Sequence, residues 1–181
     1  MRRTLSYWLA ATALALAVAP IPAPAEPPAG VHVYDVTPSI VAFTSHGRAW
    51  TMVFAFDVRE PLPAGSGTFV HFTRDGEEIT QYGTGIEASP DKWPVGQIIK
   101  GRTQYARFPP VMADGEYPIL VGIWTPSNGR RLYLKGIDDG QQRYQAGILV
   151  VKNHGRSLNL KGAPPMNQDA EAKIAIQNRP D

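Results

Sequence analysis

The sequence of 181 residues contains no cysteine. This absence excludes disulfide bonds, a cysteine nucleophile and the lipidated cysteine of a bacterial lipoprotein. A fold without disulfides has to be stabilised by its hydrophobic core. The region between Val31 and Val151 is long enough to form one such core.

Clustered positive charge is also absent. The chain has 18 Lys and Arg against 16 Asp and Glu, and two of the Arg, Arg2 and Arg3, lie in the first 25 residues. The remainder is formally neutral, and its basic side chains are scattered singly apart from the pair Arg130-Arg131. Nucleic-acid and anionic-membrane binding normally require a concentrated basic surface. We therefore expect no nucleic-acid partner.

No complete catalytic or metal-binding motif occurs. The four histidines lack the short spacing of zinc ligands, and there is no Gly-x-Ser-x-Gly nucleophile motif. The acidic pairs Glu77-Glu78 and Asp138-Asp139 are adjacent in sequence, so their side chains would face opposite ways on a strand. Asp138-Asp139-Gly140 could contribute to a calcium site, but the spacing of a calcium-binding loop is missing. We expect no cofactor, and the sequence favours a non-catalytic protein while leaving enzymatic activity open.

His71 is the histidine of greatest interest, because it lies in a strand-like run between Val70 and Phe72. One interpretation is a half-buried sheet histidine that is hydrogen-bonded to a neighbour. The other is a ligand-binding or metal-binding residue, which would place the site of a periplasmic enzyme or metal-dependent protein near His71.

The first 25 residues have the layout of a secretory signal peptide. Arg2 and Arg3 give a positive start, an apolar run follows from about Leu5 to Ala19, and Ala23-Pro24-Ala25 supplies an Ala-x-Ala cleavage site. The run is shorter than the roughly 20 residues of a membrane span. The alternative is an uncleaved anchor helix. We expect export by a cleavable signal to the periplasm or the medium, with no membrane span in the mature chain.

The rest of the chain predicts an all-β fold. Short β-rich runs recur between turn residues, and no helical period of comparable strength appears between Val31 and Val151. We expect a single immunoglobulin-like antiparallel β-sandwich of seven or eight strands. Its predicted boundaries are a Pro-rich lead-in at 26–30, the sandwich at 31–152, and a polar tail at 153–181 that is largely disordered or a short helix. The predicted strands are Val31–Val36, Ala49–Val58, Thr68–Thr73, Glu78–Tyr82, Gln97–Phe108, a hairpin within 115–134, and Gln142–Val151.

Residues 115–134 predict two strands joined by a Pro-Ser-Asn-Gly turn. Tyr117, Ile119, Val121 and Ile123 fall on one face, because successive strand side chains point to opposite sides. Pro118 removes a ladder donor and indicates an edge or an interrupted strand.

Three segments carry a resemblance to a known class of module. They are Phe69–Phe72 with Asp75-Gly76, then Trp93-Pro94-x-Gly96 with Ile98, Ile99 and Arg102, and finally Gly115–Trp124 with Gly129–Leu132. Together they resemble the immunoglobulin-like β-sandwich modules of bacterial cell-envelope proteins, including those attached to membrane glycosyltransferases and surface-polysaccharide proteins. The resemblance covers about Trp50 to Val151. It implies a sandwich fold and an envelope setting, and no catalytic residue set comes with it.

Exposed aromatics are the best candidates for a binding site. If the core set of the predicted hairpin faces inward, Trp124 faces outward and Tyr133 stands near it on the returning strand. Such a pair could form a platform for sugar rings or an anchor for a protein partner, whereas a buried Trp124 would close the core. Trp93 has the same two interpretations, and Trp50 is expected in the core.

The expected function is that of an exported, non-catalytic binding or assembly module of the bacterial envelope. Its partner would be an envelope polysaccharide or an envelope protein, and the binding candidates are Trp124, Tyr133, Trp93 and His71. Two alternatives stay open: the enzyme or metal-dependent protein described above, and a structural subunit that assembles through its sheet edges. The oligomeric state is open in each case.

Overall fold

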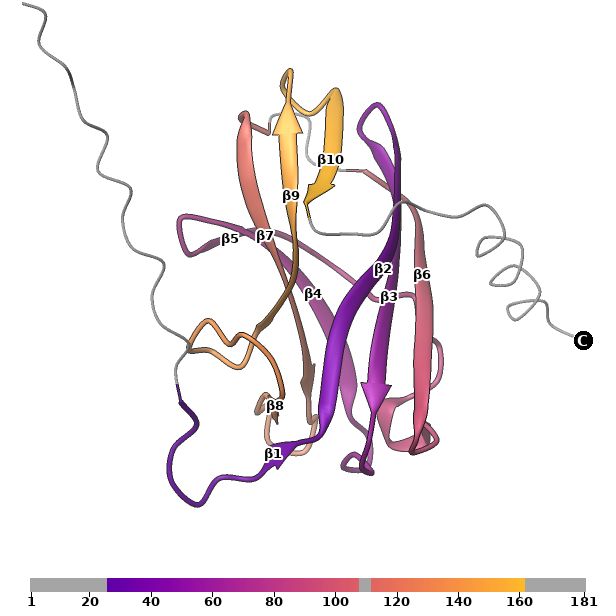
Figure 1. The fold of residues 1–181 in the computed structure, drawn as a ribbon, viewed down its shortest axis with the longest axis vertical. Helices are drawn as coiled ribbons and strands as arrows, with labels where there is room; N and C mark the ends of the chain where they lie inside the picture. The colour runs from indigo at the N-terminus through magenta and orange to yellow at the C-terminus, as the bar shows by residue number, and fades with distance from the viewer. Residues whose placement is uncertain (1–25, 108–111, 162–181) are drawn as a thin grey trace, which may run out of the picture.

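The computed structural model describes residues 26–107 and 112–161, and within them the fold is all-β (Figure 1). The one helical element of this part of the chain is a single 3-10 turn, Pro90–Lys92. The strands are β1 (Val33–Tyr34), β2 (Val36–His46), β3 (Ala49–Val58), β4 (Gly67–Arg74), β5 (Glu77–Tyr82), β6 (Gln97–Arg107), β7 (Gly115–Trp124), β8 (Tyr133–Leu134), β9 (Tyr144–Lys152) and β10 (Ser157–Lys161).

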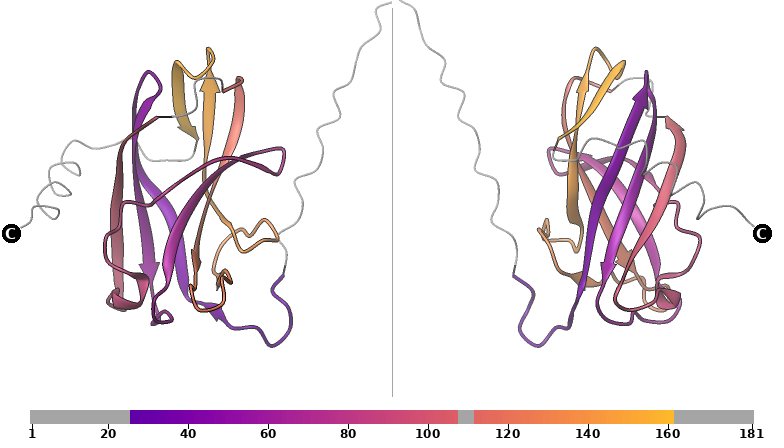
Figure 2. Two further views of the ribbon diagram at one scale, coloured as in Figure 1. Left: turned by 180° about the vertical axis from the view of Figure 1, so that it is seen from behind. Right: turned by 45° about the vertical axis from the view of Figure 1, so that its right-hand side comes forward.

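Eight of these strands form two antiparallel sheets. One sheet has the order β10-β9-β7-β4-β5 and the other has the order β2-β3-β6. The two sheets lie as separate layers in Figures 1 and 2, and the tip of the β4–β5 hairpin projects beyond the larger sheet. Strands β1 and β8 form a small parallel pair at one end of the layers.

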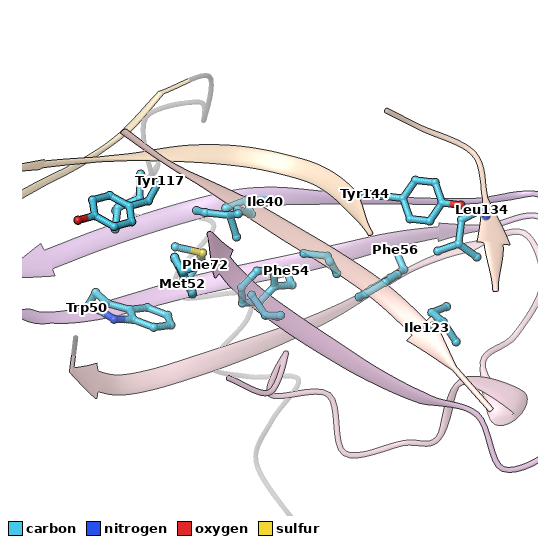
Figure 3. Close-up of a cluster of buried hydrophobic side chains, with 14 of the residues drawn as sticks. Ile40, Trp50, Met52, Phe54, Phe56, Phe72, Tyr117, Ile123, Leu134 and Tyr144 are labelled. Carbon is cyan, nitrogen blue, oxygen red and sulfur yellow. Dashed lines mark hydrogen bonds between the residues drawn. The ribbon is translucent and has the colours of Figure 1, made fainter. Parts of the chain in front are cut away.

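The core lies between the two layers (Figure 3). It is built from alternate residues of facing strands, as the period of two requires. Strand β3 contributes Trp50, Met52, Phe54, Phe56 and Val58, and β7 contributes Tyr117, Ile119, Val121 and Ile123. Each fully buried large apolar side chain stabilises the fold by about 1.5–3 kcal/mol relative to exposure. The predicted inward faces of both strands, and Trp50 as a core residue, are thus confirmed.

Strand β2 lies in a stretch where no strand was predicted beyond Val36. Pro38 is unfavourable for a strand, and a bulge between Ile40 and Ala42 interrupts the alternation. A proline is tolerated here because β2 is an edge strand of its sheet. The bulge adds Val41 to the strand, so Ile40 and Phe43 both reach the core.

Strand β10 corrects the predicted domain boundary. The polar tail was expected to begin at residue 153, but Ser157–Lys161 pairs with β9 and buries Leu158. The turn before it is tight: Asn153, His154 and Gly155 all have positive φ, and Asp114 accepts the backbone N–H groups of Asn153 and His154. The sandwich therefore continues at least to Lys161. The predicted tail residues 162–181 lie outside the described residues, as does the predicted signal peptide at 1–25.

The predicted hairpin within residues 115–134 is wrong in its pairing. Strand β7 is central in its sheet, between β4 and β9, and β8 pairs with β1. The chain does turn back after β7, but only a bridge between Trp124 and Arg131 joins the two arms. The reason is that β9 occupies the ladder position beside β7 that the returning arm would need.

Pro118 fits within a central strand because the ladder to β4 has already ended. That ladder stops at Phe72↔Ile119, and the Pro118 carbonyl accepts a hydrogen bond from the Thr73 hydroxyl at 3.4 Å. The N and C=O of one strand residue point to the same neighbour. The nitrogen of Pro118 therefore points towards β4 beyond the end of that ladder, where no backbone group is paired with it. Strand β7 is thus an interrupted strand and not an edge strand.

The described residues include no helix with the length and apolar character of a membrane span.

Candidate ligand-binding groove

An open groove of about 870 Å³ lies at the end of the molecule that carries β1 and β8. One side is formed by Val31, His32 and Tyr34, and the other by Thr125 and residues 127–133 of the β7–β8 connection. Pro63 and Gln142 complete the lining. The surface is therefore mixed, with aromatic rings, hydroxyls, amides and guanidinium groups next to one another.

The β1–β8 pair holds the two sides together. Val33 is in register with Tyr133, and Tyr34 with Leu134. Leu134 is buried in the core, and its backbone N–H donates to the Tyr144 hydroxyl at 2.7 Å. Burial raises the pKa of Tyr144 to about 12, so this hydroxyl stays protonated at neutral pH. The groove is thus fixed to the sandwich through a buried hydrogen bond.

The β7–β8 connection is internally hydrogen-bonded. Asn128 Oδ1 accepts from the Thr125 hydroxyl at 2.7 Å and from the Arg130 N–H at 2.9 Å. Backbone bonds run from Thr125 N–H to the Arg130 carbonyl and from Gly129 N–H to the Thr125 carbonyl. Gly129 has a φ of 65°, which glycine adopts without steric cost. The wall of the groove is therefore ordered before any ligand binds, which reduces the entropy lost on binding.

The N-terminal wall is held by a carboxylate. His32 packs edge-on against the Tyr34 ring, with centroids 4.4 Å apart. Its Nε2 lies 3.0 Å from Glu60 Oε1, which also accepts the Asp35 N–H at 2.6 Å. These contacts explain how a short, exposed segment keeps a defined position beside the sandwich.

Tyr133 lines the groove, whereas Trp124 does not. The groove therefore contains only one member of the predicted aromatic pair. Trp124 is 38% exposed and faces outward, so it does not close the core. Its indole lies against Gly67 on β4, where a Cβ would meet Nε1 at 2.7 Å.

Trp93 is a core residue, and its candidacy as an exposed binding residue is corrected. It is 5% exposed, its ring lies 4.9 Å from that of Phe56, and its indole N–H donates to the Ala88 carbonyl at 2.9 Å. The 3-10 turn before it carries the chain back over the core edge. With its donor satisfied and its ring covered, Trp93 offers no surface to a ligand.

His71 is buried on the outer face of the larger sheet, 6% exposed. Its Nδ1 lies 2.8 Å from Glu78 Oε2, within ion-pair distance but without hydrogen-bond geometry. Burial lowers the pKa of His71, Glu78 opposes this shift, and the positive charges of Arg131 and Arg143 add to it. The folded state therefore favours the neutral imidazole.

Phe69 and Arg143, two neighbours of His71, already make contacts within the protein. The Phe69 ring lies 4.8 Å from the His71 ring, and Arg143, itself buried, pairs with Asp139 at 2.6 Å. In the part of the chain that the structure describes, no group of three or more acidic or histidine side chains could hold a metal ion. The alternative of a metal-dependent site at His71 therefore lacks a ligand set within these residues.

Comparison of the chain with protein-family models, with curated protein sequences and with solved structures gave no match.

Most of the groove could not be identified from the sequence. Tyr133 was expected to be exposed on the basis of its alternation with Leu132 and Leu134. His32, Tyr34 and Asn128 come from segments that become neighbours only through the β1–β8 pair. The one available signal was the adjacent Arg130-Arg131 beside a turn sequence.

Proposed function

We propose that the protein is an exported, non-catalytic binding module of the bacterial envelope, and that it binds a polysaccharide in the groove between β1 and β8. The observation that carries the proposal is the composition of that groove. Tyr133 offers aromatic surface to sugar rings, and Tyr34, which packs partly against the core, forms part of the wall, while Asn128, Gln142 and the arginines offer hydrogen-bond partners for hydroxyl groups.

The strand order supports an immunoglobulin-like sandwich. Counting from β2 and leaving out the two-residue β8, the first, second and fifth strands form one sheet, and the seventh, sixth and third strands lie side by side in the other. The fourth strand, β5, pairs with the third, and β10 extends the larger sheet beyond β9. Such sandwiches present their loops at the two ends, and the groove lies at one of these ends.

Export is supported by the signal-peptide pattern of residues 1–25. An extracytoplasmic protein without cysteine has no disulfides, and the extensive two-sheet core provides the alternative source of stability.

Polysaccharide binding is favoured over assembly through the β5 edge of the larger sheet. The free edge at β5 begins with Glu77 and Glu78, and a bulge lies between Phe72 and Thr73 of the strand that it pairs with. Charged residues and bulges are features that discourage edge-to-edge association. A standard protein interface involves about 20–30 residues on each side, whereas 13 residues line this groove.

The test is calorimetric titration of the purified protein with a panel of bacterial polysaccharides, repeated with Tyr133→Ala. Loss of the ring should weaken binding by about 1 kcal/mol, roughly fivefold. Trp124→Ala is the matched control, because Trp124 is an exposed aromatic outside the groove. Equal losses in both variants, or no binding to any member of the panel, would contradict the proposal.

A further inference from the structure

The groove has a pronounced charge asymmetry. Its lining includes Arg130 and Arg131, and none of the described residues that line it carries a carboxylate. The chain outside residues 1–25 is formally neutral, so this asymmetry is local and does not follow from the overall charge.

The two arginines are not neutralised by any acidic residue that the structure describes. Two other arginines of the sandwich do pair with acids: Arg59 lies 2.8 Å from Asp57, and Arg143 lies 2.6 Å from Asp139. Within residues 26–107 and 112–161, no Asp or Glu lies within ion-pair distance of Arg130 or Arg131. Their charges are therefore available to a ligand.

The nearby acids have other partners. Glu60, behind the N-terminal wall, binds His32 and the Asp35 N–H, while Asp139 is held by the buried Arg143. Neither carboxylate needs a groove arginine to satisfy it. A negatively charged ligand would therefore not have to displace an internal ion pair.

Arg131 is held in place before binding. Its guanidinium lies over the Phe69 ring, 5.0 Å from the centroid, and its Nη1 donates to the Gln141 carbonyl at 3.0 Å. Arg130 is exposed, but its backbone is fixed by Asn128. A positioned guanidinium matches the planar carboxylate and also accepts phosphate or sulfate oxygens.

We propose that the ligand of this groove is an acidic glycan, whose carboxylate, phosphate or sulfate groups are bound by Arg130 and Arg131 while a sugar ring lies against Tyr133. This assignment rests on the proposed function and specifies the chemical class of its ligand. Only two guanidinium groups take part, so the affinity should fall with salt, but less steeply than in nucleic-acid binding.

The experiment uses an array of immobilised polysaccharides that carry uronate, phosphate or sulfate groups, together with neutral polysaccharides. We expect acidic polysaccharides to bind at least tenfold more tightly than neutral ones. The anionic group of the polysaccharides that bind best would identify the natural substituent. The best acidic ligand is then titrated into wild type, the double variant Arg130→Gln/Arg131→Gln, and Arg131→Lys. The double variant should lose at least tenfold in affinity, and Arg131→Lys should lose less. Thermal unfolding of each variant checks that the fold is retained.

Arg156→Gln is the matched control, because Arg156 is exposed in the β9–β10 turn at the opposite end of the molecule (Figure 1). An equal loss in this control would mean nonspecific charge attraction and would overturn the inference. Binding confined to neutral polysaccharides, or acidic binding that survives in the double variant, would also overturn it and leave the proposed function standing. Absence of binding across the whole array would overturn both.

Discussion

Gly122→Ala should destabilise the protein through a single aromatic ring. Gly122 lies on the outer face of β7, opposite Phe69 of β4. A Cβ at this position would meet Phe69 Cζ at 2.3 Å and Cε1 at 2.7 Å, far inside van der Waals contact. The ring has to move by more than about 1 Å to reach the 3.5–4 Å of a normal carbon contact, and Arg131, which lies over it, has to move as well.

The expected magnitude combines two opposing effects. Overpacking of a well-packed site costs about 1–3 kcal/mol. Replacing glycine by alanine also restricts the unfolded chain, which contributes about 0.4–1 kcal/mol in the other direction. The net decrease in the free energy of unfolding should therefore be about 1–2 kcal/mol, measured by urea denaturation. Gly83→Ala is the control, because a Cβ there meets nothing within 4 Å.

A double-mutant cycle with Phe69→Ala tests the cause. Once the ring is absent, Gly122→Ala should be neutral or slightly stabilising, so the coupling between the two positions should exceed about 1 kcal/mol. Additive effects would refute this explanation, because the strain would then come from the Gln142 carbonyl, which lies 3.0 Å from the same Cβ.

Two further predictions concern the histidine and the tryptophans. Because burial lowers the pKa of His71 from its ordinary value of 6.5, the unfolded chain takes up a proton below pH 6.5 that the folded chain resists. The stability that this pKa difference contributes above pH 6.5 is lost as the pH falls towards the pKa of the folded state. The urea midpoint of wild type should therefore exceed that of His71→Gln by more at pH 7.5 than at pH 5. A constant difference between the two midpoints would contradict the burial argument. Trp93→Ala should cost about 3–5 kcal/mol in unfolding free energy as a core truncation, whereas Trp124→Ala should cost clearly less; equal costs would place both rings in the core.

The sheet-forming residues could be predicted from the sequence where alternation is uninterrupted. Ala49–Val58 is strand β3 with its predicted bounds, and the Asp75-Gly76 turn joins β4 to β5 with the positive φ values of 53° and 85° typical of a tight hairpin. Strand β2 was missed because Pro38 argues against a strand and a bulge interrupts its period. Strand β10 was missed because a four-residue turn and three polar residues mask Leu158 and Leu160.

The groove was less accessible to prediction because it depends on long-range pairing. Strand β8 follows β7 closely in sequence, and local reasoning therefore assigns it to β7. Its observed partner is β1, about a hundred residues away, since β9 competes for the side of β7. Periodicity identified Tyr133 as outward-facing, but only the tertiary structure brings it beside His32 and Tyr34.

The glycine and aromatic pairs on the outer face of β4 and β7 also determine how these strands align. Gly67 is opposite Trp124 and Phe69 is opposite Gly122, so each aromatic ring on one strand lies across from a glycine on the other. A shift by two residues would keep every inward-facing residue inward, and the core pattern alone does not forbid it. One such shift would oppose Phe69 to Trp124, and the other would oppose Gly67 to Gly122 and leave both backbones uncovered. The two pairs thus select one alignment among those that the core would accept.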